Sequence, residues 1–333
     1  MTTAVITGIG VVAPTGIGVE EHWRASLAGR CGLAPVPDAA DLPVRVAGQV
    51  AGFDETRWVE PRLIVQTDRW TWFALAATRL ALADAALDPG TLPPLELSVV
   101  TASGSGGNAF GQREIQALWR VGPTAVSAYQ SIGWFYAASS GQVSIRHQLK
   151  GACGVIVSDG AGGLDAVWHA RRLLARRGRA VVVGGTEAPL SPYALTCLSS
   201  QRTLSGEADP AGAYRPFARD AAGHVPGEGG AMLVVEPREA AYARGARPYA
   251  VVAGAASTHD AYHHEDRPPD CRQLVHAIRQ ALDRAGLTPP GVDVVFADGA
   301  GDRRGDELEV AALREVFGDR PPPVTVPKTM TGR

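Results

Sequence analysis

Apolar and polar residues follow two different periods along this chain, and the switches between the two periods predict its elements. In chain order the pattern predicts a strand at 3–14 that enters a glycine-rich turn, a helix at 18–29 closed by Gly29, a helix at 69–87, a strand at 97–103, a helix at 111–122, one or two helices within 128–149, a strand at 179–188, and a strand followed by a helix within 229–245. The helix at 69–87 is apolar on all sides, which indicates that it is buried. Strands that alternate with helices in this way indicate an α/β fold.

The pattern restarts near Arg247. Residues 249–258 resemble the first strand and turn, 271–287 form an amphipathic helical pattern, and 292–301 predict another strand that runs into a glycine turn. We therefore expect two related halves, residues 1–246 and residues 247–333. The second half is much shorter and stops directly after an apparent strand, so we expect it to be incomplete at its end.

The segment VIVSDGAGGLDAVWHARRLL, residues 155–174, joins an apolar strand to a helix through a run of small residues. A strand, a tight turn and a helix often present a nucleophile, because the turn exposes one side chain at the positive end of the helix. The apex of this turn is Gly160, which has no side chain. The segment therefore predicts the geometry of a nucleophile site without the nucleophile.

Composition and charge exclude several classes of protein. The formal net charge of -2 gives no electrostatic reason to expect binding to nucleic acid or to an anionic membrane. The four cysteines, at positions 31, 153, 197 and 271, lack CxxC spacing and predict neither a zinc site nor a disulfide scaffold. The first residues do not form a signal peptide, and no apolar run reaches the roughly 18–20 residues of a membrane helix. We therefore expect a cytoplasmic protein.

Two glycine- or serine-rich motifs fit known binding sites only in part. Gly8, Gly10 and Ala13 have the spacing of a dinucleotide-binding turn, but Pro14 delays the following helix to about Val19, so we interpret the motif as a structural turn. Ser103 and Ser105 lack the flanking residues of a serine nucleophile elbow.

Two further candidates are a metal site and a thiol. His263, His264 and Glu265 lie in a polar loop, where adjacent side chains point apart, and they do not predict a metal site. Cys153 stands early in its strand, and we expect it to point into the packing of the sheet as part of the core. A buried cysteine in apolar surroundings is a poor nucleophile.

Three stretches together resemble the β-ketoacyl synthase family of condensing enzymes. They are the turn SDGAGGLDA, the segment YRPFARDAAGHVPGEGGAMLVVE, and VDVVFADGAG followed by DELE and VPKTMTGR. The resemblance runs from the first strand to the last residue. It implies a thiolase-like fold, layered αβαβα and built from two related halves, and it implies no cofactor and no metal.

The resemblance also assigns the catalytic positions. In an active synthase a cysteine at the turn takes the acyl chain as a thioester, and two histidines stabilise the enolate formed on decarboxylation. The matching positions here are Gly160 for the cysteine, Asp298 for the first histidine and Arg333 for the second. Only the family's lysine is retained, as Lys328. A carboxylate at position 298 would repel an enolate, so the resemblance implies a chain that does not condense substrates by itself.

A synthase scaffold without its catalytic residues resembles one group in particular, the chain length factor (KSβ) subunits of bacterial type II aromatic polyketide synthases. The segments GGNAFGQREIQALW and VPKTMTGR are similar to that group. The resemblance implies a heterodimer with a catalytic ketosynthase, KSα, and contact through that complex with the acyl carrier protein that carries malonyl or polyketide chains. Chain length factors typically carry glutamine at the turn, so Gly160 puts any decarboxylase role in doubt.

Within this group, the residues that gate the polyketide tunnel map onto Asn108, Gly111 and Ile115. Their spacing of 3 and 4 places them on one face of a helix. Because these side chains are small or medium, the resemblance implies a deep tunnel and a long product, a decaketide or beyond. We expect Phe110 and Trp119 to serve in core or interface packing, and residues 131–142 to lie at the heterodimer interface.

Two other functions stay open from the sequence. The chain could carry its own acyl-transfer or malonyl-decarboxylation chemistry through Asp159, Asp298 or Cys153. It could also be a purely structural partner that stabilises an active synthase without touching the substrate. These alternatives differ in whether an acyl-enzyme forms and in whether substitutions in the tunnel change product length or only yield.

Overall fold

The computed structural model describes residues 3–36, 42, 44–176, 178–263 and 266–333. The chain forms two compact units, which are described separately. Unit 1 comprises Met1–Arg30, Gln49–Ala194 and Gly227–Val252, and unit 2 comprises Cys31–Gly48, Leu195–Pro226 and Ala253–Arg333. One helix, α8 (Pro192–Ser199), contains a boundary between them.

Unit 1 is built on a mixed sheet. Among the described residues its strands are β1 (Ala4–Ala13), β2 (Gly16–Ile17), β5 (Leu97–Ala102), β6 (Cys153–Ile156), β7 (Ala180–Glu187), β8 (Gly229–Pro237) and β9 (Ala250–Val251). They lie in the order β2-β1-β8-β7-β5-β6, and β9 pairs with β1. The pairs β5–β6 and β5–β7 are parallel, whereas β1–β8 and β7–β8 are antiparallel. In the described part of the chain β6 is therefore an edge strand.

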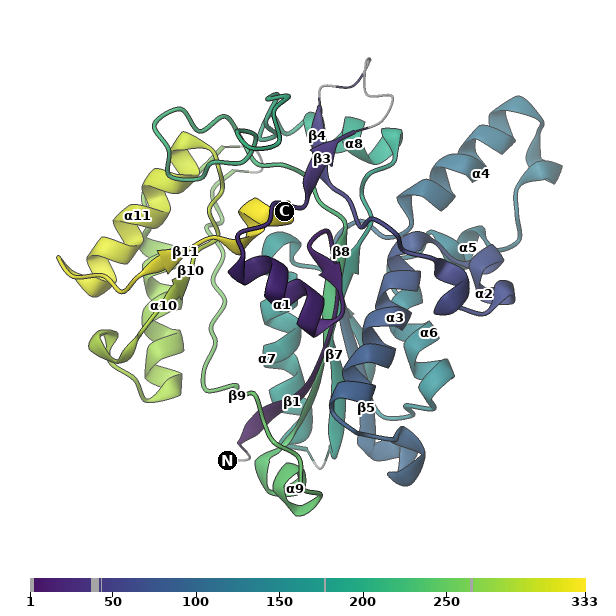
Figure 1. Cartoon of the computed structure of the whole chain (residues 1–333), viewed down its shortest axis with the longest axis horizontal. Coiled ribbons are helices and arrows are strands. Elements are labelled where there is room, and N and C mark those ends of the chain that lie inside the picture. Colours follow the sequence, from purple (N-terminus) through teal and green to yellow (C-terminus); the bar gives the residue numbers. More distant parts are fainter. Residues whose placement is uncertain (1–2, 37–41, 43, 177, 264–265) are drawn as a thin grey trace. The chain divides into compact units, whose positions relative to one another are not determined.

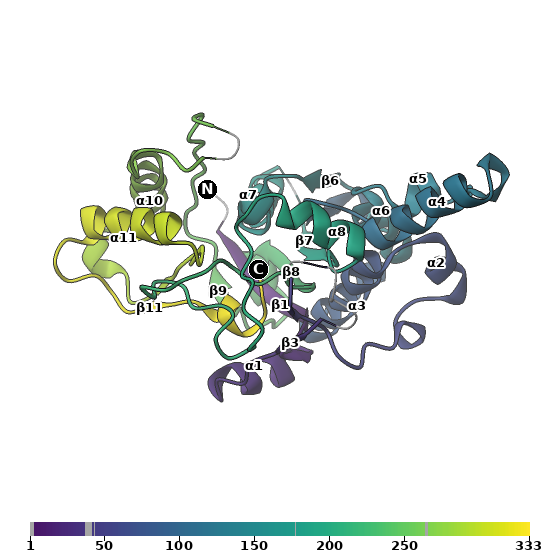
Figure 2. The ribbon, with the colours of Figure 1, turned by 90° about the horizontal axis from the view of Figure 1, so that it is seen from above.

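Helices cover both faces of this sheet. The long helix α3 (Arg69–Asp84) and α6 (Ala138–His147) pack on one face, and α7 (Gly162–Leu174) packs on the other, as Figures 1 and 2 show. Successive residues of β7 point to opposite faces: Val182 joins the cluster with α3, and Val181 and Val183 join the cluster with α7. This explains why the sequence of β7 is a continuous apolar run, which is typical of a strand buried on both faces.

The predicted turn at Gly8 and Gly10 is wrong. Strand β1 continues through both glycines, and α3 crosses it there. A Cβ atom would lie 2.2 Å from the Ala81 carbonyl oxygen at Gly8 and 1.9 Å from the Ala77 carbonyl oxygen at Gly10. The two glycines are needed for a close approach of helix and strand.

The other helices of unit 1 are α1 (Val19–Leu27), α2 (Pro61–Gln66), α4 (Asn108–Arg120), α5 (Gln130–Gly133) and α9 (Arg238–Ala243). The chain leaves α1 through Gly29 in the left-handed conformation (φ 62°), as predicted. Helix α4 begins three residues before the predicted start at 111, and the predicted region 128–149 contains two helices, α5 and α6.

Unit 2 has short strands and two long helices. Strands β3 (Leu33–Pro35) and β4 (Val46–Gly48) pair antiparallel, and β10 (Val295–Phe296) and β11 (Val324–Thr325) pair parallel. Helices α10 (Arg272–Ala285) and α11 (Arg303–Phe317) lie side by side in Figures 1 and 2 and share a small apolar cluster. The predicted strand at 249–258 is mostly wrong, because only Ala250 and Val251 are extended in a ladder, as β9.

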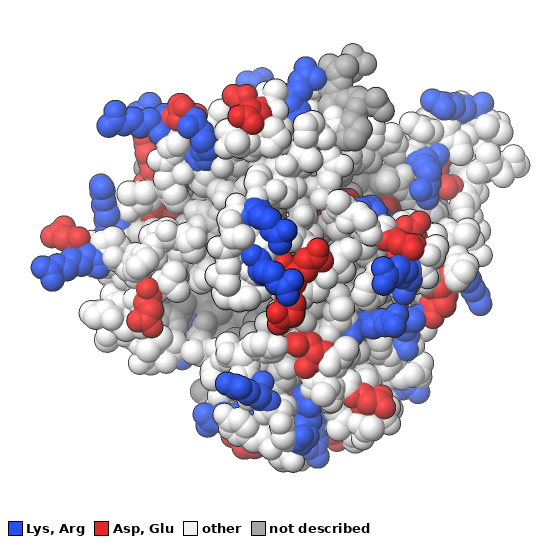
Figure 3. All heavy atoms as spheres, viewed as in Figure 1, with Lys and Arg blue, Asp and Glu red and all other residues white. Residues whose placement is uncertain are grey.

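No helix within the described ranges is long and apolar enough to cross a membrane. On the face drawn in Figure 3, basic and acidic side chains are interspersed and neither sign dominates. That face offers no single-sign field of the kind that attracts a polyanion.

Candidate functional site

The predicted turn after β6 is present in unit 1. The strand ends at Ile156, a short 3₁₀ turn spans Asp159–Ala161, and α7 follows directly from Gly162. Asp159 has a φ of 45°, in the left-handed region, where asparagine and aspartate are tolerated better than most residues. Ser158 donates a hydrogen bond of 2.7 Å to the Asp165 carboxylate in the first turn of α7.

Gly160 lies at the exposed apex of this turn. The neighbouring residues of the helix start are also accessible, and Leu164 is 77% exposed. The strand, turn and helix that would present a nucleophile are therefore formed, and the apex of the turn is accessible. Position 160 itself offers only backbone groups.

Beside the turn, the loop after β5 is held by a glutamate that the sequence did not single out. Glu187, at the end of β7, accepts hydrogen bonds from the hydroxyls of Ser103 and Ser105, both 2.9 Å, and from the backbone N–H of Gly104. Burial raises the pKa of Glu187 against the effect of these donors. Ser103 and Ser105 are thus loop anchors, which agrees with the absence of a serine elbow motif.

Cys153 is exposed, and its predicted place in the core is wrong. The reason is the sheet order: β6 is the edge strand of the described sheet, so its start has a neighbour on one side only. A cysteine in the same position of a central strand would have been covered.

Helix α4 carries the three predicted tunnel positions on one face. Asn108 is half-buried in the first turn, Gly111 is buried, and Ile115 is 47% exposed. Phe110 is only 2% exposed and belongs to the core, as expected, whereas Trp119 is 81% exposed near the end of the helix.

The start of α4 is fixed by a residue that sequence reasoning missed. The carboxylate of Asp68 accepts hydrogen bonds from the backbone N–H of Arg69 at the start of α3 (2.5 Å) and of Phe110 in α4 (2.7 Å). Burial raises the pKa of Asp68, opposed by these two donors. Asp68 is separated from α4 by about 40 positions of sequence, so no local pattern could have indicated this contact.

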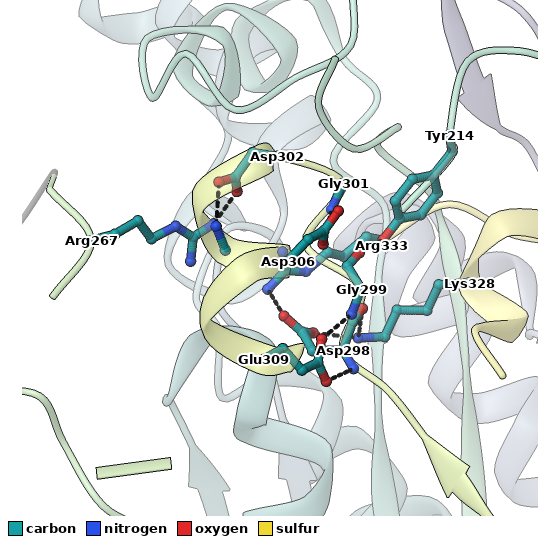
Figure 4. A network of polar contacts seen from close by, with 11 residues as sticks. Tyr214, Arg267, Asp298, Gly299, Gly301, Asp302, Asp306, Glu309, Lys328 and Arg333 are labelled. Carbon is teal, nitrogen blue, oxygen red and sulfur yellow. Dashed lines mark hydrogen bonds and ion pairs between the residues drawn. The ribbon is translucent and has the colours of Figure 1, made fainter. Parts of the chain in front are cut away.

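In unit 2 the structure brings together Asp298, Lys328 and Arg333, three of the four positions to which the resemblance assigns the family's catalytic residues. The Asp298 carboxylate lies 2.5 Å from Lys328 Nζ and 3.0 Å from Arg333 Nη2 (Figure 4). Burial raises the pKa of Asp298, but the charges of Arg333 and Lys328 outweigh it and hold that pKa below its usual value. Asp298 is thus an ionised partner of two cations.

The loop that carries Asp298 keeps a defined shape. Glu309 on α11 accepts hydrogen bonds from the backbone N–H of Asp298 (2.7 Å) and of Gly299 (2.8 Å). Gly299 and Gly301 have φ values of 58° and 72°, which favour glycine. The conformation of this loop is therefore fixed by Glu309 and by its two glycines.

Acidic and aromatic groups complete this network. Asp306 accepts from the backbone N–H of Gly301 at 3.0 Å, and the Tyr214 hydroxyl donates to the Gly299 carbonyl at 2.7 Å (Figure 4). Asp302 at the start of α11 pairs with Arg267. These contacts account for the retained sequence DELE after the loop, because its first aspartate, Asp306, and Glu309 both bind backbone N–H groups.

His224 lies near this network and was not singled out from the sequence. Its Nδ1 is buried and has no hydrogen-bond partner among the described residues. Burial, and then the charge of Arg333, lowers the pKa of His224 to about 4, so its ring is neutral at pH 7.

The structure gives no indication of a metal centre within the residues that it describes: no three histidine, cysteine, aspartate or glutamate side chains form a group that could hold an ion. Of the HHE motif, His264 and Glu265 lie outside the described residues. His263 Nδ1 lies 3.4 Å from an Asp266 carboxylate oxygen.

The sequence matches two consecutive domains of one family. These are the beta-ketoacyl synthase N-terminal domain over residues 1–241 and the beta-ketoacyl synthase C-terminal domain over residues 249–333.

Two relatives come from Streptomyces. The chain is 51% identical over 336 residues to a polyketide beta-ketoacyl synthase 2 of Streptomyces coelicolor, an alignment that covers 99% of this chain and 78% of that protein. It is 50% identical over 334 residues to the tetracenomycin polyketide synthase ketoacyl synthase beta subunit of Streptomyces glaucescens, with 99% and 81% covered.

Solved structures have the same fold. The ishigamide ketosynthase/chain length factor matches with a TM-score of 0.91 and 27% identity, over 99% of this chain and 81% of that one. A type II polyketide synthase acyl-carrier protein in complex with its ketosynthase bound to the hexaketide matches with a TM-score of 0.88 and 27% identity, over 100% and 82%.

Proposed function

The chain belongs to the β-ketoacyl synthase family and has its thiolase-like fold, and from this premise we propose that it is a non-catalytic chain length factor. In this role it pairs with a catalytic ketosynthase and shapes the tunnel in which an aromatic polyketide precursor grows. The catalytic partner supplies the cysteine and the two histidines.

The observation that carries the proposal is the ion-pair network of Asp298, Lys328 and Arg333. In a condensing enzyme of the family the first and last of these positions donate hydrogen bonds to a developing enolate oxygen. Here a carboxylate stands at one position and is neutralised by the two cations. Together with the missing side chain at Gly160, this arrangement supplies neither a thiolate nor a histidine pair.

Partners follow from the relatives. One solved neighbour is a ketosynthase/chain length factor and another holds a ketosynthase with its acyl-carrier protein. We infer that this chain forms a heterodimer with a ketosynthase and meets the acyl carrier protein through that complex, in the cytoplasm.

The partner surface that we propose is the edge of the sheet at β6 with the aromatic segment after α5. Trp134, Phe135 and Tyr136 are 47%, 41% and 39% exposed, and Val157, just after β6, is 56% exposed. Exposed aromatic side chains next to an edge strand are typical of a surface that a partner covers.

The proposed tunnel wall is the face of α4 with Asn108, Gly111 and Ile115. We propose that the small and medium side chains there permit a long product, a decaketide or beyond. Asn108→Phe should shorten the product of the reconstituted complex, because the larger ring would enter the tunnel one turn before Gly111.

The test uses the chain co-expressed with a type II polyketide ketosynthase (KSα) and an acyl carrier protein, with product length measured by mass spectrometry. We expect no condensation by the chain alone, no acyl-enzyme on it at Cys153, Asp159 or Asp298, and a defined product from the complex. Trp119→Phe, on the exposed far end of α4, is the matched control and should leave the length unchanged.

The outcomes separate three functions. An acyl-enzyme on the isolated chain would instead favour its own acyl-transfer chemistry. If Asn108→Phe changes only yield and never length, the chain is a structural partner and the proposed tunnel role is wrong.

A further inference from the structure

Helices α4 and α5 approach each other through glycines. A Cβ atom at Gly107, which directly precedes α4, would lie 1.9 Å from the carbonyl oxygen of Gly133 on α5. The N–H of Gly107 donates to the carbonyl of Trp134 at 3.1 Å. The backbones of the two segments are therefore in direct contact, and the large side chains of this crossing must fit beside the glycines.

Two aromatic rings fill the space that the glycines leave. The ring of Phe110 lies over Gly133, where a Cβ atom would come within 2.6 Å of the Phe110 Cδ2. The indole of Trp134 lies over Gly111, where a Cβ atom would come within 2.8 Å of the Trp134 Cδ1. Each helix thus contributes one glycine and receives one ring from the other segment.

The two rings differ in exposure. Phe110 is 2% exposed and locks α4 to the core, whereas Trp134 is 47% exposed. The indole therefore has one edge against Gly111 and another part that faces outward from this unit.

Trp134 also lies at the centre of the proposed gate. Asn108 and Ile115 stand one turn before and one turn after Gly111 on the same face of α4. A side chain at position 111 would point at the indole, so the volume opposite Gly111 is already occupied by a ring from the neighbouring segment.

We propose that Trp134 is a specificity-determining residue that limits product length beside Gly111. The proposal rests on the proposed function of α4 as a tunnel wall. It assigns the bulk at this point of the wall to the segment after α5, in place of the side chain at position 111. A glycine at 111 then indicates room for the indole, and the free depth of the tunnel there depends on the Trp134 rotamer.

The test is a double-mutant cycle in the co-expressed complex with its ketosynthase and acyl carrier protein. Trp134→Ala should open the wall and raise the ratio of longer to wild-type-length product by at least about tenfold, because even one methylene of pocket volume discriminates by roughly this factor. Gly111→Phe should displace the indole and shorten the product. The double variant Gly111→Phe with Trp134→Ala should return to a length close to that of the wild type, since one ring replaces the other.

Two control variants separate an effect on product length from an effect on the assembly of the complex. Trp134→Phe keeps an aromatic ring and should give a smaller shift in the same direction, so the proposal stays testable if Trp134→Ala reduces the yield of the complex. Tyr242→Ala removes a 61% exposed aromatic side chain on α9, outside the proposed partner surface, and should leave product length unchanged.

The results distinguish this proposal from the proposed function. If Asn108→Phe shortens the product while the Trp134 variants do not alter length, Trp134 is not a determinant and the tunnel role of α4 stands. If the changes in product length caused by Trp134→Ala and Gly111→Phe simply add in the double variant, the two side chains do not occupy the same space. The proposal is then overturned. If no variant on this face alters length, the tunnel assignment itself fails.

Discussion

Asp298 joins two cations to a loop of defined shape. The loop keeps its glycines and its bonds to Glu309, but the side chain at position 298 binds Lys328 and Arg333. The network holds the last residues of the chain, 327–333, against the loop that follows β10. At the residue scale this part of unit 2 is therefore a set of ion pairs around one carboxylate.

Removing the shared carboxylate should destabilise this network. Asp298→Ala leaves two neighbouring cations without their partner, and we expect a loss of about 1 kcal/mol, or roughly 2 °C in apparent Tm, because Asp298 is partly exposed and screened by solvent. The measurement is thermal unfolding of the co-purified complex. Arg303→Ala, which removes an exposed pair with Glu307 on α11, is the control and should have no measurable effect; equal losses in the two variants would contradict the network.

His224 predicts a pH dependence of stability. Its pKa of about 4 in the folded chain results from burial first and then from Arg333, with Arg267 acting in the same direction and Asp298 and Asp302 against it. In the unfolded chain a histidine has a pKa of about 6.5. Between these values the unfolded chain binds a proton that the folded chain does not.

Stability should therefore be highest above about pH 6.5 and should fall as the pH decreases towards 4, by up to about 3 kcal/mol from this residue. His224→Phe should reduce this slope in chemical denaturation measured from pH 7 to pH 4. His276→Phe, at an exposed position of α10, is the matched control. An unchanged slope in His224→Phe would show that the ring is not buried in its neutral form.

At the scale of elements, one carboxylate joins the starts of two helices. Asp68 accepts from Arg69 in α3 and from Phe110 in α4, so the position of the proposed tunnel wall depends on a residue at the start of the central helix. The crossing with α5 adds the second constraint, through Gly107 and Gly133. Helix α4 is thus held at its first turn, and its far end is exposed.

Asp68→Ala should loosen α4 at this point. Two N–H groups lose their acceptor, and we expect a loss of roughly 2–4 kcal/mol together with a broader distribution of product lengths. Asp68→Asn keeps one carbonyl acceptor and should cost less. Asp88→Ala, which removes the acceptor of an exposed turn at Gly90, controls for loss of a surface cap. Thermal unfolding and product mass spectrometry of the complex give the two readouts, and a uniform product length in Asp68→Ala would contradict the positioning role.

At the scale of the whole molecule, the proposed partner surface combines exposed aromatic residues with an edge strand. Strand β6 pairs only with β5 within the described residues, and Cys153 and Val157 at its two ends are accessible. The division into halves at Arg247 stays a prediction, since each of the two compact units draws on several stretches of the chain.

A charged side chain in the proposed partner surface should prevent assembly with the ketosynthase. Phe135→Asp places a carboxylate where we propose that a partner buries an aromatic side chain, and the amount of co-purified ketosynthase should fall by at least about tenfold. Tyr242→Asp, at a 61% exposed aromatic on α9, is the control and should bind normally. Normal co-purification of Phe135→Asp would place the partner elsewhere.

The sequence by itself determined the features that depend on neighbouring residues. The alternating strands and helices and the turn at Gly160 are local patterns, whereas the roles proposed for the α4 face and for positions 298 and 333 come from the resemblance to a family. The strands, helices and turn could be predicted because hydrophobic period and turn chemistry are properties of short segments.

Only the tertiary structure decided which residues meet. Gly8 and Gly10 serve a helix crossing instead of a turn, Cys153 lies on an edge instead of in the core, and Asp68 and Trp134 fix and fill the surroundings of α4. Each of these depends on contacts between segments distant in the sequence, and the packing that brings such segments together leaves no local periodicity. The identities of Gly160, Asp298 and Arg333 could therefore be read from the sequence, whereas the surroundings of α4 depend on the fold.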